Sequence, residues 1–321
     1  MAPVGCAGGR ALAIPMVRDF CNASSAASAP GPIGWIEMDL TTIRHVAQPA
    51  ARAELPAFLE GDSFLAGGTW LYSEPQPHLR RLIDLCALGW EPLSIGPDGV
   101  DIAATCTLAA LNAATLPGHW PAARLVAECC RCLMGSFKVW NMATVGGNLC
   151  LALPAAPMIS LAAGLEGSCL IWSPDGNERR LSIFDFITGA RQTALRPGEV
   201  LRSLHLPAAA LRRRSEMRRA SLTKEGRSAV LLIGTRGAEG DVTLAVTAAT
   251  PRPFRFHFER VPDASQLHDT LETALPPAAY HDDVHGAPAW RRHMTLRLAQ
   301  EIRAALERDD GGSGPEGARR T

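Results

Sequence analysis

Short apolar runs, separated by glycine, proline and aspartate, fill the region from residue 38 to residue 207. Strict alternation over residues 199–206 predicts a strand, and two runs joined by Asp98-Gly99 predict a hairpin over residues 92–104. Helical spacing predicts further helices, one of which has Thr107 as its N-cap. The other predicted strands are 64–66, 80–85, 168–172 and 178–181, and the predicted helices are 42–59, 107–114, 122–134 and 157–164.

The C-terminal third repeats this mixture after a linker, residues 207–214, that carries three consecutive arginines. These arginines form either a solvated face or a patch for a partner subunit. The predicted strands are 217–222, 228–235 and 242–247, and the predicted helices are 265–275 and 290–306. This order predicts an α+β protein in which two small lobes, 38–88 and 89–207, precede a smaller α+β domain, 208–308.

The two ends of the chain differ in composition from the rest. Residues 1–37 are rich in glycine, alanine, serine and proline and lack the pattern of a signal peptide. We expect a disordered N-terminal extension there, with Met38 as a candidate biological start. Residues 309–321 are rich in glycine, glutamate and arginine and are expected to form a disordered tail.

Composition excludes several classes of function. Lysine plus arginine and aspartate plus glutamate both number 32, so net charge gives no case for nucleic acid. No apolar run has the length of a membrane-spanning helix. Nine scattered cysteines favour reduced thiols and a cytoplasmic location, and Cys129, Cys130 and Cys132 are interpreted as helix packing rather than metal ligands. We expect no metal site and name no catalytic residue.

Two glycine pairs with similar surroundings are the candidate chemistry. Gly67-Gly68 follows a strand-like run and precedes Thr69, and Gly146-Gly147 lies between Thr144 and Asn148. Glycine lets a ligand approach the backbone, and main-chain N–H groups bind phosphate, so paired turns favour a diphosphate. Most glycine pairs are tight turns, and either pair alone is best explained in that way. Neither fits the Gly-x-Gly-x-x-Gly or Gly-Lys-Ser/Thr pattern of common nucleotide loops.

Three phrases occur together in the order known from one family. They are Ala-Gly-Gly-Thr at 66–69, Thr-Val-Gly-Gly-Asn-Leu at 144–149 and Ala-Leu-Arg-Pro-Gly-Glu at 194–199. Over residues 39–306 the chain resembles the FAD-binding medium subunit, or flavin domain, of the molybdenum hydroxylases, the xanthine dehydrogenase and carbon monoxide dehydrogenase family. The resemblance implies a two-lobed FAD-binding domain of the PCMH type over 38–207, followed by the C-terminal α+β domain.

The resemblance also implies a set of residues around non-covalent FAD. Main-chain N–H groups of both glycine pairs would hold the pyrophosphate, so valine at Gly68 or Gly146 should release FAD with little loss of fold. Asn148 would either fix its own loop or contact the cofactor. The carried-over residues are Leu65, Ala66, Gly67, Gly68, Thr69, Trp70, Leu71, Thr144, Val145, Gly146, Gly147, Asn148, Leu201 as an apolar flavin contact and Arg218 where some relatives have lysine.

Three positions depart from the family pattern. Pro157 replaces an aspartate that follows the second glycine pair, Trp140 precedes that pair where arginine is common, and Trp70 follows the first pair where aspartate or serine is common. Trp140 is interpreted either as a buried side chain or as a ring that stacks on the cofactor. These changes affect the expected affinity for flavin more than the expected fold.

The implied function is electron transfer in a multi-subunit molybdenum hydroxylase. In such relatives a large subunit holds the molybdenum cofactor, and a small subunit, or a fusion of the two, holds [2Fe-2S] clusters that reduce FAD. FAD then reduces an external acceptor, so this chain would be an oxidoreductase subunit inactive on substrate alone. Two alternatives are a self-sufficient flavin oxidoreductase of the same fold and a scaffold subunit that has lost FAD.

Overall fold

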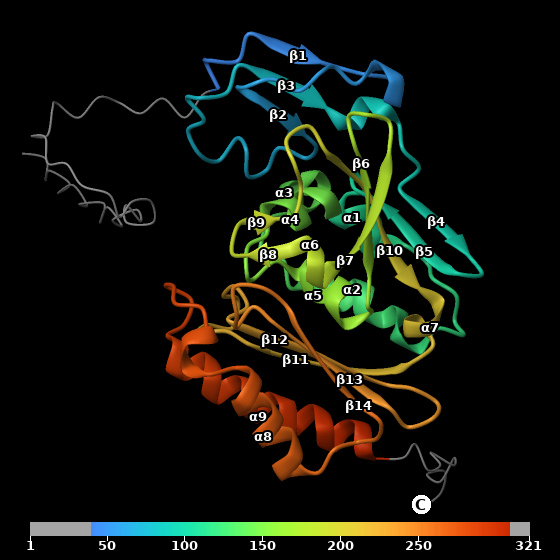
Figure 1. Cartoon of the computed structure of the whole chain (residues 1–321), viewed down its shortest axis with the longest axis vertical. Helices are drawn as coiled ribbons and strands as arrows, with labels where there is room; N and C mark the ends of the chain where they lie inside the picture. The colour runs from blue at the N-terminus through green and yellow to red at the C-terminus, as the bar shows by residue number, and fades with distance from the viewer. Residues whose placement is uncertain (1–39, 309–321) are drawn as a thin grey trace, which may run out of the picture. The chain divides into compact units, whose positions relative to one another are not determined.

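The computed structural model describes residues 40–308, and within them the strands form three sheets and one two-stranded ribbon (Figure 1). The first sheet is parallel, with order β1-β3-β2, and contains β1 (His45–Ala47), β2 (Asp62–Leu65) and β3 (Arg81–Asp84). The second is antiparallel and contains, in order, β4 (Leu93–Gly96), β5 (Gly99–Ala103), β10 (Val200–Pro207), β6 (Ser168–Trp172) and β7 (Glu178–Ser182). The ribbon pairs β8 (Ile187–Gly189) with β9 (Gln192–Thr193).

The third sheet and the helices form the rest of the described part. This sheet is an antiparallel meander of β11 (Arg214–Ala220), β12 (Val230–Arg236), β13 (Val242–Thr247) and β14 (Phe254–Phe258). The α-helices are α1 (Leu108–Ala113), α2 (Arg124–Arg131), α3 (Phe137–Met142), α4 (Val145–Leu151), α5 (Pro157–Gly164), α6 (Ile183–Phe186), α7 (Ala208–Leu211), α8 (Ala264–Ala274) and α9 (Pro288–Glu307). Short 3₁₀ turns are η1 (Arg52–Glu54), η2 (Leu85–Leu88), η3 (Pro121–Ala123) and η4 (Pro277–Ala279).

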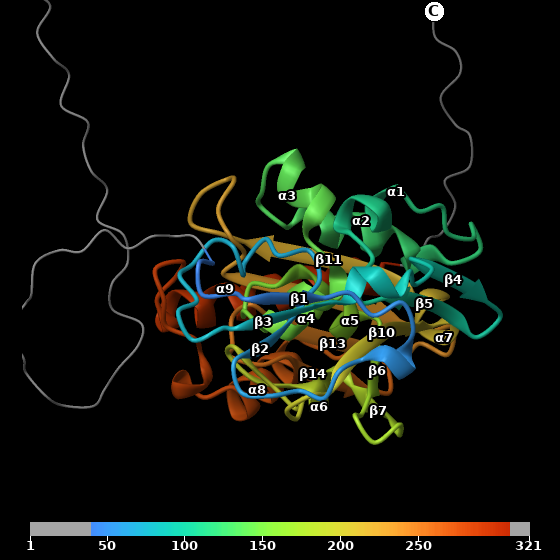
Figure 2. The ribbon, with the colours of Figure 1, turned by 90° about the horizontal axis from the view of Figure 1, so that it is seen from above.

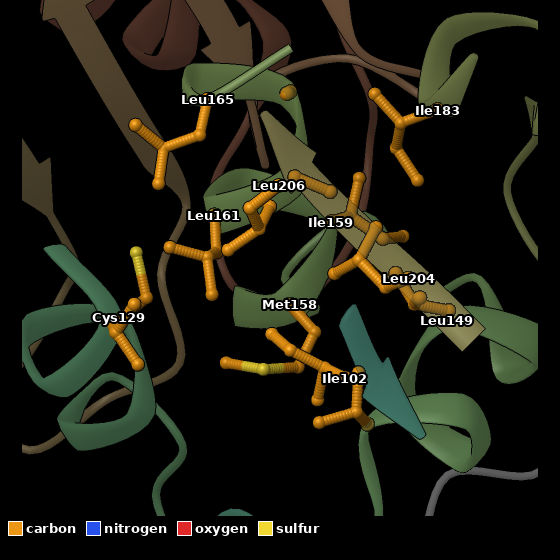
Figure 3. Close-up of a cluster of buried hydrophobic side chains, with 14 of the residues drawn as sticks. Ile102, Cys129, Leu149, Met158, Ile159, Leu161, Leu165, Ile183, Leu204 and Leu206 are labelled. Carbon is orange, nitrogen blue, oxygen red and sulfur yellow. The ribbon is translucent and has the colours of Figure 1, made fainter. Parts of the chain in front are cut away.

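Helix α5 lies at the centre of the packing, with all eight of its residues buried. It packs against α2 and α4 on one side and against β12 and β13 on the other. Met158 and Leu161 of α5 meet Leu149 of α4, Ile102 of β5 and Leu204 of β10 in one apolar cluster (Figure 3). A helix that is apolar all round must be enclosed by protein, as this one is.

The third sheet buries both of its faces because its strands alternate between two cores. Leu231 and Ile233 belong to the cluster around α5, whereas Val230 and Leu232 belong to the cluster with α8 and α9. Figure 1 shows α8 and α9 on the side of this sheet that faces away from α5. Figure 2 shows α1, α2 and α3 gathered on one side of the second sheet.

Several local predictions are confirmed, and one is wrong. The hairpin of β4 and β5 is present and turns at Pro97-Asp98, one residue before the predicted Asp98-Gly99. Thr107 Oγ1 accepts a hydrogen bond of 3.2 Å from Ala110 N–H as the N-cap of α1. The helix predicted over 42–59 is instead β1, η1 and extended chain. Pro49 and Pro56 interrupt any long helix there, so the apolar spacing was misleading.

Two arginines of the basic linker have partners inside the protein. Arg213 Nη1 lies 2.7 Å from Asp241 Oδ2, and Arg214 donates to backbone carbonyls at the end of α9. These contacts tie the linker to the C-terminal sheet and helix. The predicted division of the chain at residues 88 and 207, like the expected disorder of residues outside 40–308, stays a prediction.

Candidate functional site

The first glycine pair lies against the residues that precede the second pair. Parallel pairing of β2 with β3 brings residues 66–71 out of the sheet at Leu65, and Gly67 then reaches the end of α3. A Cβ at Gly67 would collide with the carbonyl oxygen of Met142 and lie 3.3 Å from the Cα of Ala143. Only glycine allows this approach. It brings residues 66–71, called here the first turn, into contact with the residues just before Thr144.

The first turn has a row of backbone donors without protein acceptors. Its backbone runs through Gly68 at φ +67°, and Tyr72 N–H donates to the carbonyl of Gly68 over 2.9 Å. For the N–H groups of residues 67–71 we find no acceptor anywhere in residues 40–308, although all five residues are partly buried. Main-chain N–H groups without a protein acceptor can donate to an anion, so such a row fits an anionic ligand.

The second glycine pair has a different structure from the expected loop. It forms the first turn of α4, in which Thr144 Oγ1 accepts a hydrogen bond of 3.1 Å from Gly147 N–H. The N–H of Gly146 donates to Ala104 O over 2.8 Å, and that of Val145 donates to Cys106 O over 2.9 Å. These N–H groups are therefore not available to a phosphate, in contrast to the expectation from the sequence.

Gly146 is a glycine because of packing. A Cβ there would lie 2.5 Å from the Cβ of Ala104 and 2.7 Å from its carbonyl oxygen, closer than real contacts allow. Gly147, by contrast, is exposed, and a Cβ there would meet only Thr144 Oγ1, at 3.0 Å. The expectation that valine at Gly146 would spare the fold is therefore wrong.

The structure supports one of the two roles expected for Asn148, that of fixing its own segment of the chain. Its Oδ1 accepts a hydrogen bond of 3.0 Å from Met158 N–H in the first turn of α5, so Asn148 fixes the connection between α4 and α5. The amide nitrogen of Asn148 and the hydroxyl of Thr69 have no acceptor or donor partner among residues 40–308. Both groups remain available to a ligand near the first turn and the start of α4.

Two aromatic rings and one arginine border the first turn. The ring of Tyr72 covers Gly68, where a Cβ would strike it, and burial raises the pKa of the Tyr72 hydroxyl. The guanidinium carbon of Arg191 lies 5.4 Å from the centroid of the Trp70 ring. Arg191 N–H also donates to Ala152 O over 2.8 Å, which fixes the residue at the end of α4. Arg191 places a positive charge beside the row of free N–H groups.

Sequence patterns do not indicate that Arg191 or Met142 belongs to the candidate site. Arg191 lies shortly before the phrase at 194–199, but nothing in that spacing connects it with Trp70, more than 100 residues earlier. Met142 contributes a backbone carbonyl, and any residue type would supply that group. Long-range contacts of this kind leave no local pattern.

The two remaining candidates lie apart from the first turn. Leu201 is buried at the start of β10, in the core that contains α4 and α5. Arg218 pairs with Leu232 in the sheet and therefore lies on the face covered by α9, with its Nη1 2.9 Å from Glu216 Oε2 and its Nε 3.7 Å from Glu301 Oε2. The structure does not bring Arg218 to the glycine turns.

Two of the departures from the family pattern have structural roles. Trp140 Nε1 donates to Leu133 O over 3.1 Å, and the ring packs against the core. Pro157 is buried at the first position of α5, where proline is well tolerated. Both residues are therefore part of the local packing around the second glycine pair.

Neither the cysteines nor the cavities of residues 40–308 form a second candidate site. Cys129 and Cys130 are buried in α2, and burial raises the pKa of the Cys130 thiol to about 12. No group of three or more histidine, cysteine, aspartate or glutamate side chains in these residues could hold a metal ion, and none of their helices could cross a membrane. Two small cavities lie between β13, β14 and α8, α9 and beside Pro154, and neither is lined by a residue of the first turn.

Comparisons with known proteins give one family and one fold. The sequence model of the family described as FAD binding domain in molybdopterin dehydrogenase matches residues 41–209. A chain of quinoline 2-oxidoreductase from Pseudomonas putida 86 superposes with a TM-score of 0.68 at 22% identity, covering 82% of this chain and 96% of that one. No curated protein matches the sequence.

Two carbon monoxide dehydrogenases share the same fold. For the enzyme from Hydrogenophaga pseudoflava the TM-score is 0.66 at 18% identity, with 82% of this chain and 98% of that chain covered. For the reconstituted enzyme from Oligotropha carboxidovorans it is 0.66 at 20% identity, with 82% and 97% covered. At these identities the likeness establishes the fold and its extent.

Proposed function

Because the chain belongs to the family of FAD-binding domains of molybdopterin dehydrogenases, we propose that it holds FAD non-covalently at the first turn. The observation that carries this proposal is the row of free N–H groups at residues 67–71, placed against the residues that precede α4. A pyrophosphate has two negative charges and several acceptor oxygens, so it suits these donors and the nearby Arg191.

The residues of the first turn and of the start of α4 would have separate roles. The N–H groups of residues 67–71 would bind the pyrophosphate, and the free hydroxyl of Thr69 would add a donor. Thr144 and Gly146 would hold α4 in place as the opposite wall, without donating to the phosphate themselves. Leu201, buried in the core, would support the packing of α4 without touching the ligand. Bound FAD supplies the redox chemistry, accepting electrons and passing them on.

The electron-transfer role extends the proposal to partners. The solved relatives are a quinoline 2-oxidoreductase and carbon monoxide dehydrogenases, one described as lacking part of its molybdenum cofactor. We propose that this chain is likewise the flavin subunit of a complex. A large subunit would hold the molybdenum cofactor, a small subunit or fusion would hold [2Fe-2S] clusters, and the scattered cysteines support a cytoplasmic setting.

Flavin binding is testable with the chain alone. The full chain is purified, its absorption spectrum is recorded, and the flavin-free protein is titrated with FAD while flavin fluorescence is followed. We expect stoichiometric flavin, or saturable binding of added FAD, without turnover of a reducing substrate by the isolated chain. A folded, colourless protein that does not bind FAD at a large excess would overturn the proposal.

A further inference from the structure

Arg52 connects the parallel N-terminal sheet to the second sheet at a point distinct from Gly67. Arg52 lies in η1, directly after β1, and its guanidinium reaches the turn between β6 and β7. Its Nη1 lies 2.8 Å from Glu178 Oε1, and its Nη2 lies 3.0 Å from Gly176 O and 2.8 Å from Asn177 O. One arginine thus makes three hydrogen bonds to a turn more than 120 residues away in the sequence.

The same guanidinium begins a stack of cations and indole rings. The Cζ of Arg52 lies 4.5 Å from the centroid of Trp172, and the Cζ of Arg202 lies 5.6 Å from that centroid and 4.4 Å from the centroid of Trp90. The two indole rings meet edge to face with centroids 5.3 Å apart. Arginine and tryptophan form the strongest side-chain cation–π pairs, more so where water is excluded.

The guanidinium of Arg202 lies against both of these rings. Among residues 40–308 it has no hydrogen bond or ion pair; burial lowers the pKa of Arg202, and the carboxylates of Asp101 and Glu178 act on it in the opposite direction. The contacts with Trp90 and Trp172 therefore help to hold it in place. Because Arg52 stands at the other end of the stack, it extends an arrangement built from β6, β10 and the chain just before β4.

The phrase at 194–199 contributes to the same connection. Gly198, at φ +79°, faces Phe58, and a Cβ there would lie 3.0 Å from the Cβ of Phe58 and from Cγ of Pro174. Glu199 is buried and accepts hydrogen bonds of 2.9 and 2.6 Å from the guanidinium of Arg179. The phrase therefore shapes the surface on which the chain between η1 and β2 rests.

We propose that the stack of Arg52, Trp172, Arg202 and Trp90, called here the clamp, positions the first turn for the cofactor. Because β1 and β2 both pair with β3, fixing η1 at one end of this sheet restrains the whole sheet. The first turn follows β2 directly, so the clamp holds Gly67 against Met142. Arg52 is a positioning residue and does not touch FAD. This inference rests on the proposed function.

If the clamp positions the first turn, removing the Arg52 side chain should weaken FAD binding although every residue of the first turn is still present. When only a fraction of molecules has the turn in place, the apparent dissociation constant rises by the inverse of that fraction. We therefore expect Arg52→Ala to raise the Kd for FAD about fivefold to tenfold. The matched control is Arg180→Ala, an arginine of β7 whose hydrogen bond, 3.4 Å to Ser168, stays within the hairpin.

Two readouts on the full chain test the clamp. The first is FAD titration of the flavin-free proteins, and the second is hydrogen exchange of backbone amides at residues 62–73 without FAD. We expect Arg52→Ala to bind FAD more weakly and to exchange faster in this segment, while thermal unfolding changes by only a few degrees and Arg180→Ala behaves as wild type. Arg52→Lys keeps the charge near Glu178 but loses the planar fork, so a smaller change in the same direction is expected.

The outcomes separate this inference from the proposed function. If wild type binds FAD and both Arg52 variants bind equally well with unchanged exchange, the clamp is overturned and flavin binding stands. If wild type does not bind FAD, the proposed function fails, and unchanged exchange at residues 62–73 would overturn the clamp as a restraint on the turn. If Arg52→Ala does not fold, Arg52→Lys and Trp172→Phe replace it, and wild-type affinity and exchange in both would overturn the clamp.

Discussion

The two glycine pairs stand in similar sequences, but their N–H groups have opposite hydrogen-bonding states. At residues 67–71 the N–H groups have no acceptor within the described part of the chain, whereas those of Val145, Gly146 and Gly147 donate to Cys106, Ala104 and Thr144. The first pair belongs to a turn after a parallel strand, and the second begins a helix. A glycine pair in a sequence therefore indicates close approach but not which partner approaches.

The difference has a physical cause in what each glycine faces. Gly67 lets one backbone touch another while the donors beside it stay free, and Gly146 lets a helix start directly on Ala104. We therefore expect a substitution at Gly146 to act mainly on folding and a substitution at Gly68 to act on ligand binding. The variants below test this separation, starting with the largest expected effect.

Gly146→Val should destabilise the fold. The side chain would be forced against Ala104, and overpacking of a core typically costs about 1–3 kcal/mol, with more where backbone is struck. We expect the free energy of unfolding in urea to fall by about 3 kcal/mol. Gly147→Val, at an exposed position, should cost about 1 kcal/mol or less. Equal stability of the two variants would contradict the distinction.

Gly68→Ala should weaken FAD binding in addition to any effect on the fold. An alanine at φ +67° costs about 1–2 kcal/mol, and its Cβ would also strike the ring of Tyr72, so the turn must shift. We expect the Kd for FAD to rise about tenfold, which corresponds to about 1.4 kcal/mol. Adding Tyr72→Ala removes the steric part and should restore some affinity. Unchanged FAD affinity in Gly68→Ala would show that this turn does not hold the ligand.

Arg191→Ala should have a moderate effect that depends on salt. A cation beside a pyrophosphate contributes through partly screened electrostatics, so we expect the Kd for FAD to rise about threefold at low ionic strength and less at high ionic strength. Titrations at two salt concentrations measure this. Arg297→Ala, on the exposed side of α9, serves as the control. A salt-independent result for Arg191→Ala would exclude a role for its charge.

The smallest effect concerns acid stability of the N-terminal sheet. The Arg81 guanidinium, with Nε 2.9 Å from Asp62 Oδ1, lowers the pKa of that carboxyl below its ordinary value of 3.8. A lowered folded-state pKa contributes stability above the unfolded value and loses it as pH falls through the folded value. We expect unfolding experiments below pH 4 to show a loss in wild type that is smaller in Asp62→Asn. An identical pH dependence in wild type and Asp62→Asn would show that the Asp62–Arg81 pair contributes nothing to acid stability.

Sequence patterns predicted the elements that local chemistry determines. The β4–β5 hairpin and the cap at Thr107 depend on a few adjacent residues, and both are present, with the turn one residue earlier than predicted. The helix predicted at 42–59 failed because β1 pairs with β3, a contact that lies outside any local window. Parallel pairing and the prolines together outweighed the apolar spacing.

The candidate site was predictable only in part for the same reason. The sequence indicated both glycine pairs, but not that α4 would use the donors of the second pair. Arg191 beside Trp70 and Arg52 on Trp172 join residues more than 100 positions apart, and no spacing rule connects them. Such pairs follow from how the sheets meet, which emerges only in the folded chain.

Residue-resolved hydrogen exchange of the backbone amides, with and without FAD, shows which N–H groups hold the cofactor. We expect FAD to slow exchange at residues 67–71 by about tenfold or more, because their N–H groups gain acceptors. The amides of Gly146 and Gly147 should already exchange slowly and change little. Strong protection of Gly146 and Gly147 by FAD, with no change at residues 67–71, would contradict the account.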